Sequence, residues 1–343
     1  MSDPAKNTPV TVDLYVAEGF VLTEFSAVVE ILRIANRVTA RRVFDWAFRS
    51  KSGGPIGCRS EAMVATSPIP ERPKADYLFV LGNSNPEHPE LSVKPIASAY
   101  MWHGAKVVLL SEAASRFIAE SGEQGPGHTT HWENRAVLNE RGTPGAGSYA
   151  LAVDDGRITT SAGMAATYDL MLSLLGAHIS AASVATVGDI MLHENIRALS
   201  SLQPFGGKEL SVTGNRALDQ CIELMQANLE EPLLISELVG FLGISERSLE
   251  RHFRSHFDVT PNGYYRELRL NQANTLLLRT KLSVRDVGLA CGFPNGFSSL
   301  FRRHFGVTPT DLRKHDKNQI GRRCVKHANY GDYDTSLRAM PCE

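Results

Sequence analysis

The stretch VVLLSEAASRFIAESG (residues 107–122) joins two hydrophobic patterns at one sharp turn. Its four leading apolar residues stop at Ser111, a run of small residues follows, and an amphipathic segment then begins. A short apolar run is typical of a buried strand, and apolar residues spaced three and four apart are typical of a helix. The stretch therefore predicts a buried strand that turns directly into a helix, which is where many α/β enzymes place a nucleophile.

Similar strand and helix patterns alternate on both sides of this stretch. Strands are expected at 10–16, 46–52, 62–68, 76–82 and 106–110, and helices at 23–38, 92–105 and 164–179. Strand and turn segments are expected at 134–140 and 148–163. Alternation of this kind is typical of an α/β domain with a mostly parallel, flavodoxin-like sheet and helices on both faces.

The pattern changes after about residue 193. Residues 197–212 are rich in Ser, Gly and Pro, and from Asn215 onward helical patterns replace strand patterns. We therefore expect an α/β domain over 1–195, a linker over 196–215 and an all-α domain over 216–315. The tail, 316–343, has no interpretable pattern.

Composition narrows the functional class. The 343 residues suffice for two or three domains, and 43% of them are hydrophobic and 21% charged. No apolar run approaches the roughly 20 residues of a membrane helix, and the first residues lack the pattern of a signal peptide. Five scattered cysteines without a C-x-x-C pair favour a reduced, cytoplasmic setting without a metal site. No cofactor is expected.

Charge is unevenly distributed along the chain. Residues 1–215 carry 18 Lys and Arg against 22 Asp and Glu, whereas residues 246–315 carry 12 against 6. An acidic body joined to a basic module makes double-stranded DNA a candidate partner.

The basic region contains an internal repeat. FRSHFDVTP (253–261) recurs as FRRHFGVTP (301–309), with seven of nine positions identical. Each copy follows a short helical pattern, a glycine (Gly243, Gly292) and a second amphipathic pattern, which together predict two helix-turn-helix units. A long helix over 262–280 would hold the two units apart, so that they could read successive major-groove faces about 34 Å apart.

Residues 216–315 resemble the AraC family of bacterial transcription activators. The motifs LGISERSLERHF (242–253), LRLNQANTLLLRTKLSVRDVGLACGF (268–293) and FRRHFGVTPTDLR (301–313) carry this resemblance. It implies that Arg247 and Arg251 point into the groove, and arginine is the commonest reader of guanine. Glu250 could accept a hydrogen bond from cytosine or orient an arginine, and Ser248 lies in the same first turns. Arg254, Arg302 and Arg303 are expected at phosphates. The alternative for each arginine is an ordinary solvated position.

The second copy departs from the family pattern. Three residues, PNG, lie between Phe293 and Phe297, where most members have five, and Ser299 occupies the position that matches Arg251. Asn295, Ser298 and Ser299 are therefore expected to read bases weakly. The second unit should make more backbone contacts and fewer base contacts.

The first half is similar to the PfpI-like, class I amidotransferase-like domain that precedes the AraC module in GlxA-type regulators. GFVLTEFSAVVEILRIANR (19–37), TTHWENR (129–135) and DDGRITTSAGMAATYDLMLSLL (154–175) carry this similarity. Catalytic relatives have a cysteine at the turn after a central strand. Alignment on IAESG (118–122) puts that position at Glu112, which cannot replace a thiolate, and Ser111 lacks a preceding glycine. No catalytic residues are therefore expected.

The same turn could still form a binding pocket, because backbone N–H groups at a helix N-terminus would face it. The resemblance implies a small-molecule effector, since family members respond to amines, quaternary ammonium compounds or amino acids. Candidate ligand residues are Glu18, Glu112, Ala113, His131 and Trp132, with Glu112 favouring a cation and Trp132 adding a cation–π face. Alternatively, Glu112 caps the helix and Trp132 belongs to the core.

The sequence thus predicts a ligand-responsive, cytoplasmic transcription regulator that is not an enzyme. We expect an activator that binds promoter DNA and RNA polymerase, forms a homodimer through its first domain, and has no membrane contact. Two alternatives remain open: an active hydrolase or amidotransferase fused to a DNA-binding module, and a DNA-binding protein whose first domain only dimerises.

Overall fold

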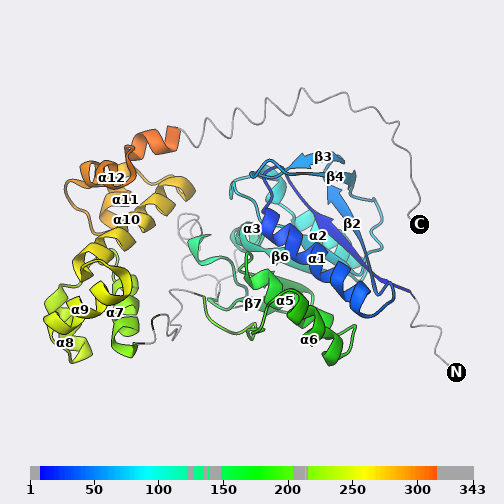
Figure 1. The fold of residues 1–343 in the computed structure, drawn as a ribbon. Coiled ribbons are helices and arrows are strands. Elements are labelled where there is room, and N and C mark those ends of the chain that lie inside the picture. The colour runs from blue at the N-terminus through cyan, green and yellow to red at the C-terminus, as the bar shows by residue number, and fades with distance from the viewer. Residues whose placement is uncertain are drawn as a thin grey trace. The chain divides into compact units, whose positions relative to one another are not determined.

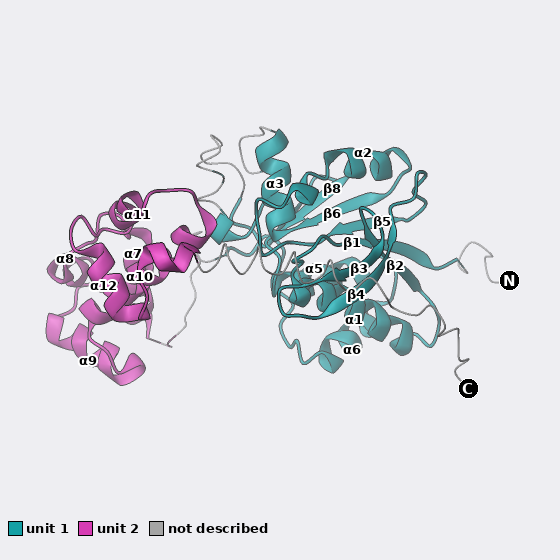
Figure 2. Cartoon of the chain, turned by 90° about the horizontal axis from the view of Figure 1, so that it is seen from above, with its two compact units in different colours: residues 1–212 teal, residues 213–343 magenta. Residues whose placement is uncertain are grey.

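The chain divides into two compact units, residues 1–212 and 213–343 (Figure 2). The structure, a computed structural model, describes residues 8–121, 127–134, 138, 148–203, 213 and 215–314. The division falls within the predicted linker, 196–215. The predicted tail, 316–343, lies outside the described residues.

The first unit is built on an eight-stranded sheet in the order β3-β4-β2-β1-β5-β6-β8-β7 (Figure 1). Pairing is parallel except at the two edges, where β3 and β7 run antiparallel to their neighbours. The strands are β1 (Val10–Tyr15), β2 (Phe44–Ser50), β3 (Gly54–Gly57), β4 (Met63–Pro68), β5 (Tyr77–Val80), β6 (Lys106–Leu110), β7 (Ala152–Asp154) and β8 (Ile158–Ser161).

Helices cover both faces of the sheet, which confirms the predicted fold class. One face packs on α1 (Leu22–Val38), α5 (Ala166–Leu175) and α6 (Ala181–Ile190), and the other on α2 (Lys94–Trp102) and α3 (Ser111–Ser121). Side chains alternate along a strand, so in β1 Leu14 enters the first hydrophobic cluster and Tyr15 the second. The prediction missed β3 and α6; α6 combines small and polar residues, AASVATVGDI, without a clear apolar stripe.

The second unit contains two helix-turn-helix units, as predicted. Its helices are α7 (Arg216–Ala227), α8 (Ile235–Leu242), α9 (Glu246–Phe257), α10 (Pro261–Arg279), α11 (Val284–Ala290) and α12 (Phe297–Phe305). Gly243, at φ +65°, makes the turn between α8 and α9, and the Ser245 side chain then accepts the Ser248 N–H to cap α9. The 19-residue α10 is about 28 Å long and separates the two helix-turn-helix motifs.

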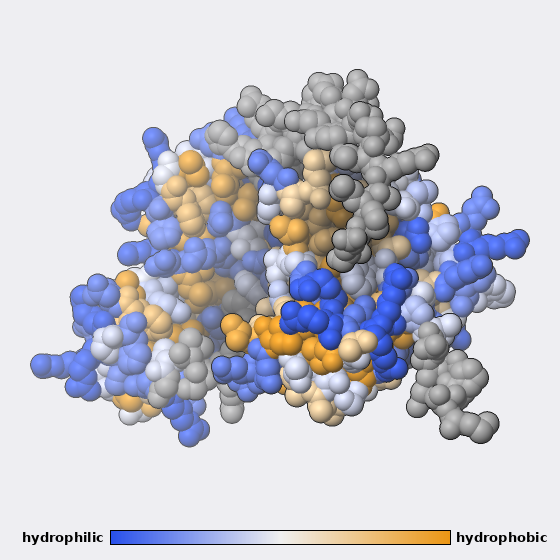
Figure 3. Space-filling view, turned by 45° about the vertical axis from the view of Figure 1, so that its right-hand side comes forward, coloured by the Kyte–Doolittle hydropathy of each residue, from blue (hydrophilic) through white to orange (hydrophobic). Residues whose placement is uncertain are grey.

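The face of the molecule shown in Figure 3 mixes polar side chains with separate apolar patches. Among the helices of the described residues, none combines the length and apolar character needed to cross a membrane.

Candidate functional site

The turn between β6 and α3 is strained at one residue. Ser111 directly follows the last residue of β6 and has φ +36°, a backbone conformation that non-glycine residues seldom adopt. Strain of this kind concentrates at functional sites. Sequence alignment predicted Glu112 for this position, but the strained residue is Ser111, because β6 ends at Leu110 and leaves no intervening residue.

A carboxylate from α1 lies directly against this turn. Glu24 is fully buried, and its Oε1 accepts hydrogen bonds from Ser111 Oγ at 2.5 Å and from the Met164 N–H at 3.1 Å. Its Oε2 accepts the Gly82 N–H at 2.7 Å. Glu24 therefore connects three segments that are far apart in the sequence: the loop after β5, the β6–α3 turn and the entry to α5.

Glu112 supplies a second carboxylate to this cluster. It is 3% exposed, and its Oε2 accepts the Asn83 N–H at 3.2 Å. Burial, and secondly the charge of Glu112, raise the pKa of Glu24 to about 7, against the opposing effect of the hydrogen bonds from Ser111, Gly82 and Met164. The charge of Glu112 thus disfavours ionisation of Glu24 close to neutral pH. We call Glu24, Ser111 and Glu112 the elbow cluster.

Two glycines make room for the elbow cluster. A Cβ on Gly82 would lie 2.0 Å from Ser111 Oγ, and a Cβ on Gly163 would lie 2.1 Å from Glu24 Oε1. Both positions therefore require glycine. Sequence reasoning missed Glu24 and both glycines. The available signal for Glu24 was a carboxylate on the apolar face of the helix predicted at 23–38, in line with Ala27, Val28 and Ile31.

Asn83 brings the predicted ligand residue Glu18 beside the cluster. The Asn83 side-chain amide donates to the Glu18 carbonyl oxygen at 2.8 Å, while its backbone N–H binds Glu112. The Glu18 carboxylate accepts the Gly57 N–H at 2.9 Å and is half-buried. The loop after β5 therefore connects Glu18 with Glu112.

The other predicted ligand residues occupy two different environments. His131 and Trp132 are half-buried, with ring centroids 5.6 Å apart, and they directly follow Thr130, whose hydroxyl donates to the Ser111 carbonyl oxygen at 2.7 Å. Ala113 is fully buried, and its methyl group packs in the hydrophobic cluster between the sheet and α3. The aromatic pair thus follows a residue that contacts the elbow cluster, whereas the Ala113 side chain lies in the core.

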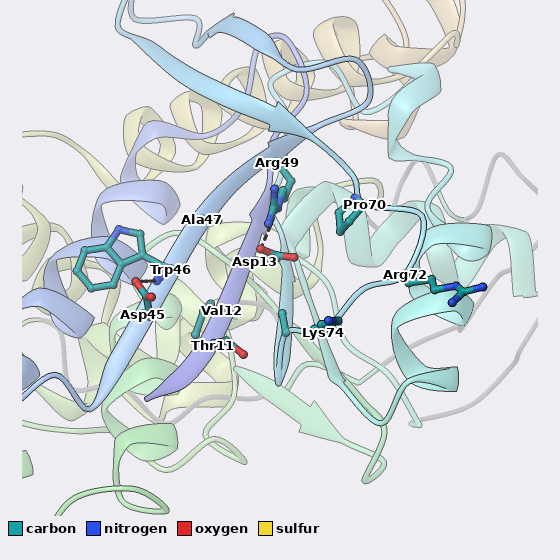
Figure 4. A pocket seen from close by; sticks show the side chains of 11 residues that line it. Thr11, Val12, Asp13, Asp45, Trp46, Ala47, Arg49, Pro70, Arg72 and Lys74 are labelled. Atoms are coloured by element: carbon teal, nitrogen blue, oxygen red, sulfur yellow. Dashed lines mark hydrogen bonds and ion pairs between the residues drawn. The ribbon is translucent and has the colours of Figure 1, made fainter. Parts of the chain in front are cut away.

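A cavity of about 470 Å³ lies elsewhere on the first unit, between β1, β2 and residues 70–75 (Figure 4). Asp13 and Arg49 form an ion pair at 2.9 Å in its wall, and Tyr100 Oη donates to Asp13 at 2.7 Å. Arg72 extends away from this pair (Figure 4). The residues that line this cavity include none of those predicted to bind an effector, and Asp13 is already satisfied, so we do not assign the effector to it. Among the described residues there is no group of three or more His, Cys, Asp or Glu that could hold a metal ion.

Helix α9 presents a charged face to solvent. Arg247, Glu250, Arg251 and Arg254 are exposed, and their spacing of three and four places them on one side of the helix. Glu250 lies 3.6 Å from Arg254, so it is positioned to orient that arginine. Ser248 instead contacts His252 at 3.3 Å, and His252 in turn contacts Asn215 at the start of α7.

Helix α12 is shorter at its beginning. The 48-residue repeat matches Phe297 with Leu249, and α12 starts at Phe297, whereas α9 starts three residues before Leu249. Asn295, the match of Arg247, therefore lies outside the helix, before Gly296 at φ +69°. Ser298, Ser299, Arg302 and Arg303 are exposed on α12.

One arginine of this basic region has a structural role. Arg269 of α10 donates to the Gly292 carbonyl oxygen at 3.0 Å and lies 4.4 Å from the centre of the Phe293 ring. Burial lowers its pKa. Arg269 therefore holds the turn of the second helix-turn-helix unit, and sequence reasoning did not identify this role.

Known proteins are similar to this chain over both units. Residues 238–315 match the family described as "Helix-turn-helix domain". The HTH-type transcriptional regulator CdhR of Pseudomonas aeruginosa is 33% identical over 306 residues, covering 86% of this chain and 89% of that protein. The HTH-type transcriptional regulator GbdR of the same species is 28% identical over 316 residues, covering 91% and 86%. Among solved structures, an AraC family transcriptional regulator from Pseudomonas putida is 22% identical with a TM-score of 0.47, covering 53% of this chain and 100% of that one.

Proposed function

The chain belongs to the AraC family of transcriptional regulators, and we propose that its first domain, whose sequence resembles the PfpI-like domain, senses a small cationic metabolite. As a member of this family the protein is a DNA-binding regulator of transcription, and its second unit supplies the helix-turn-helix motifs. The effector, the readout residues and the assembly state are the parts that we propose.

One observation carries the sensor proposal: two buried carboxylates, Glu24 and Glu112, meet at the strained elbow. Both carboxylates approach the space above Gly82, since a Cβ there would lie 3.0 Å from one oxygen of Glu24 and 2.6 Å from one of Glu112. A cation bound beside them would offset the charge of Glu112 and favour the ionised form of Glu24. Glu18 would add negative charge, and Trp132 and His131 would supply aromatic surface.

We propose that the elbow cluster has no hydrolase or amidotransferase activity. The backbone N–H groups of Gly82 and Asn83 could not serve as oxyanion donors, because each already donates to a carboxylate. The Ser111 hydroxyl donates to Glu24, but Ser111 is 1% exposed and therefore out of reach of a substrate. Turnover of amide or ester substrates that disappears in Ser111→Ala would overturn this proposal in favour of an enzyme fused to a DNA-binding module.

On the DNA-binding unit, we propose that Arg247 and Arg251 contact bases from α9. Arg254, Arg302 and Arg303 would contact phosphates, and Asn295, Ser298 and Ser299 would read bases weakly. Glu250 would orient Arg254. Ser248 would contact the DNA backbone from the first turn of α9. The exposure of the arginines and the truncated start of α12 support this division. We further propose a cytoplasmic homodimer that activates transcription through contact with RNA polymerase.

The experiment is a thermal-shift screen of the full-length protein against small amines, quaternary ammonium compounds and amino acids. We expect a cationic compound to raise the melting temperature of the wild type and of Glu71→Gln, an exposed control, but not of Glu112→Gln. If no compound shifts the wild type, the sensor proposal fails and a first domain that only dimerises becomes the better interpretation.

A further inference from the structure

The last described segment of the first unit runs along β7 and ends in a buried glutamine. The Ala152 N–H donates to the Leu199 carbonyl oxygen at 3.0 Å, and the Leu151 N–H donates to the Ser201 carbonyl oxygen at 2.9 Å. Gln203 follows at 3% exposure. This segment lies within the stretch predicted as a linker, 196–215. Along the chain, Gln203 is the last described residue of that stretch that contacts the first unit.

The Gln203 side chain uses both ends of its amide. Its Oε1 accepts the Trp132 N–H at 3.0 Å. Its Nε2 donates to the carbonyl oxygens of Thr130 at 2.9 Å and Ala150 at 3.0 Å, and approaches Thr129 Oγ1 at 3.2 Å. A single side chain therefore fixes the backbone of the loop that carries the predicted aromatic ligand residues.

The same loop contacts the elbow cluster from its other side. Thr130 Oγ1 donates to the Ser111 carbonyl oxygen at 2.7 Å and lies 2.7 Å from Ser115 Oγ. Gln203 and Ser111 thus bind the same residue, Thr130, one through its carbonyl oxygen and the other through its hydroxyl. A displacement of the turn at Ser111 reaches Gln203 through one intervening residue.

The burial of this network makes its response discrete. A buried amide that loses its partners is strongly disfavoured, and so are the N–H and C=O groups left behind. Gln203 therefore either moves with the loop or leaves it. Two such arrangements are what a signal between distant sites requires.

We propose that Gln203 is a positioning residue that transmits the state of the elbow cluster to the DNA-binding unit. The effector would act on Ser111 and on the loop 129–132, and Gln203 would carry that change into the chain that leads to residue 213. This inference rests on the proposed function of the first domain as a sensor, because only a sensor needs such a connection.

The test is a double-mutant cycle on the full-length protein without any effector. Glu112→Gln removes one charge from the elbow cluster, and DNA affinity is measured on a site selected from random DNA with the wild-type protein. We expect Glu112→Gln to change the DNA dissociation constant at least about fivefold in the wild-type background and by less than about twofold in Gln203→Ala. Gln203→Met, which keeps the volume of the side chain and loses its hydrogen bonds, should behave like Gln203→Ala if the effect is not a folding defect.

Ser201→Ala is the matched control, because Ser201 contacts β7 through its backbone oxygen and should keep the wild-type response. Equal effects of Glu112→Gln in all backgrounds, or no effect in any, would overturn the role of Gln203. The thermal-shift screen separates the two proposals. If a compound stabilises the protein but the effects of the Glu112 and Gln203 substitutions on DNA affinity are additive, the sensor proposal is supported and the transmitting role of Gln203 is rejected. A coupled cycle without any stabilising compound supports Gln203 and rejects the cationic metabolite.

Discussion

At the scale of single residues, Glu24 should give the protein a measurable pH dependence of stability. Its pKa rises from 4.5 in the unfolded chain to about 7 in the folded protein, so between these values the folded state holds a proton that the unfolded state has released. This contribution to stability is fully present below pH 4.5, falls as the pH rises, and is lost above about pH 7. The total loss is about 3 kcal/mol.

Glu24→Gln removes this titration. We expect the free energy of unfolding of wild type to fall by about 2.5 kcal/mol relative to Glu24→Gln between pH 5 and pH 8, because the variant cannot ionise. Urea unfolding at four pH values measures the difference, and the exposed Glu71→Gln should follow the wild type. Parallel pH profiles of wild type and Glu24→Gln would show that Glu24 keeps an ordinary pKa.

The arginines of α9 should differ from their matched residues on α12. Arg251→Ala is expected to reduce the preference for the selected DNA site by about 1–3 kcal/mol, because a bidentate contact to guanine is lost. Ser299→Ala, at the equivalent position, should change this preference by much less. Gel-shift titrations on the selected site and on a scrambled site measure both effects. Equal weakening of Arg251→Ala on the two sites would identify Arg251 as a phosphate contact.

The elbow cluster shows how far residue-level prediction could reach. Glu112, Glu18, His131 and Trp132 were predicted because they follow strands or sit in recognisable motifs. In the structure Asn83 contacts both Glu18 and Glu112, and His131 and Trp132 follow Thr130, which contacts the turn at Ser111. Glu24 was missed because its position depends on α1 packing over the sheet, so that residues 87 positions apart meet. The register at Ser111 depends on where β6 ends, which hydrophobic patterns do not resolve to a single residue.

At the scale of elements, the close approach of two loops to the elbow depends on glycine. Gly82→Ala would place a Cβ 2.0 Å from Ser111 Oγ and 2.6 Å from a Glu112 oxygen. We expect a loss of about 1–3 kcal/mol in the free energy of unfolding, since the neighbouring groups cannot move without breaking buried hydrogen bonds. Differential scanning calorimetry measures this loss.

Gly240→Ala is the control for that measurement, because it should raise the free energy of unfolding and not lower it. Gly240 lies inside α8 with nothing within 4 Å of an added Cβ, so alanine should stabilise the second unit by about 1 kcal/mol. If Gly82→Ala were also neutral or stabilising, the elbow would be looser than the structure indicates.

The sequence indicated that the second recognition helix, α12, starts later than α9. It did not indicate which backbone conformation causes the later start. The spacing of PNG predicted a shortened entry, and α12 does begin at Phe297 without a side-chain cap. The local cause is Gly296 at φ +69°, which stops the helix from extending toward Asn295. Arg269 holds the preceding turn at Gly292 through a contact that spans 23 positions, which no local pattern encodes.

At the scale of the whole molecule, sequence patterns were sufficient for the class of fold of both units. Strand and helix alternation predicted the parallel sheet, and the internal repeat predicted the paired helix-turn-helix units. They were insufficient for residues 197–203, because the Ser, Gly and Pro content of the whole stretch 197–212 suggested a linker. In the structure Arg197 binds the buried Asp169 at 2.6 Å and Gln203 binds the loop 129–132, contacts that no local pattern encodes.

The uneven charge of the chain gives the last prediction. Residues 246–315 carry six more basic than acidic residues, whereas residues 1–215 carry four more acidic than basic ones. About six phosphate contacts would release about five counterions, so the logarithm of the DNA association constant should fall with the logarithm of salt concentration with a slope of about −5. Arg302→Ala should reduce the size of this slope by about one while keeping the site preference, because a phosphate contact carries no sequence information. Arg72→Ala on the first unit should leave the slope unchanged. A slope near zero, or an equal change with Arg72→Ala, would mean that the basic excess of the second unit does not face DNA.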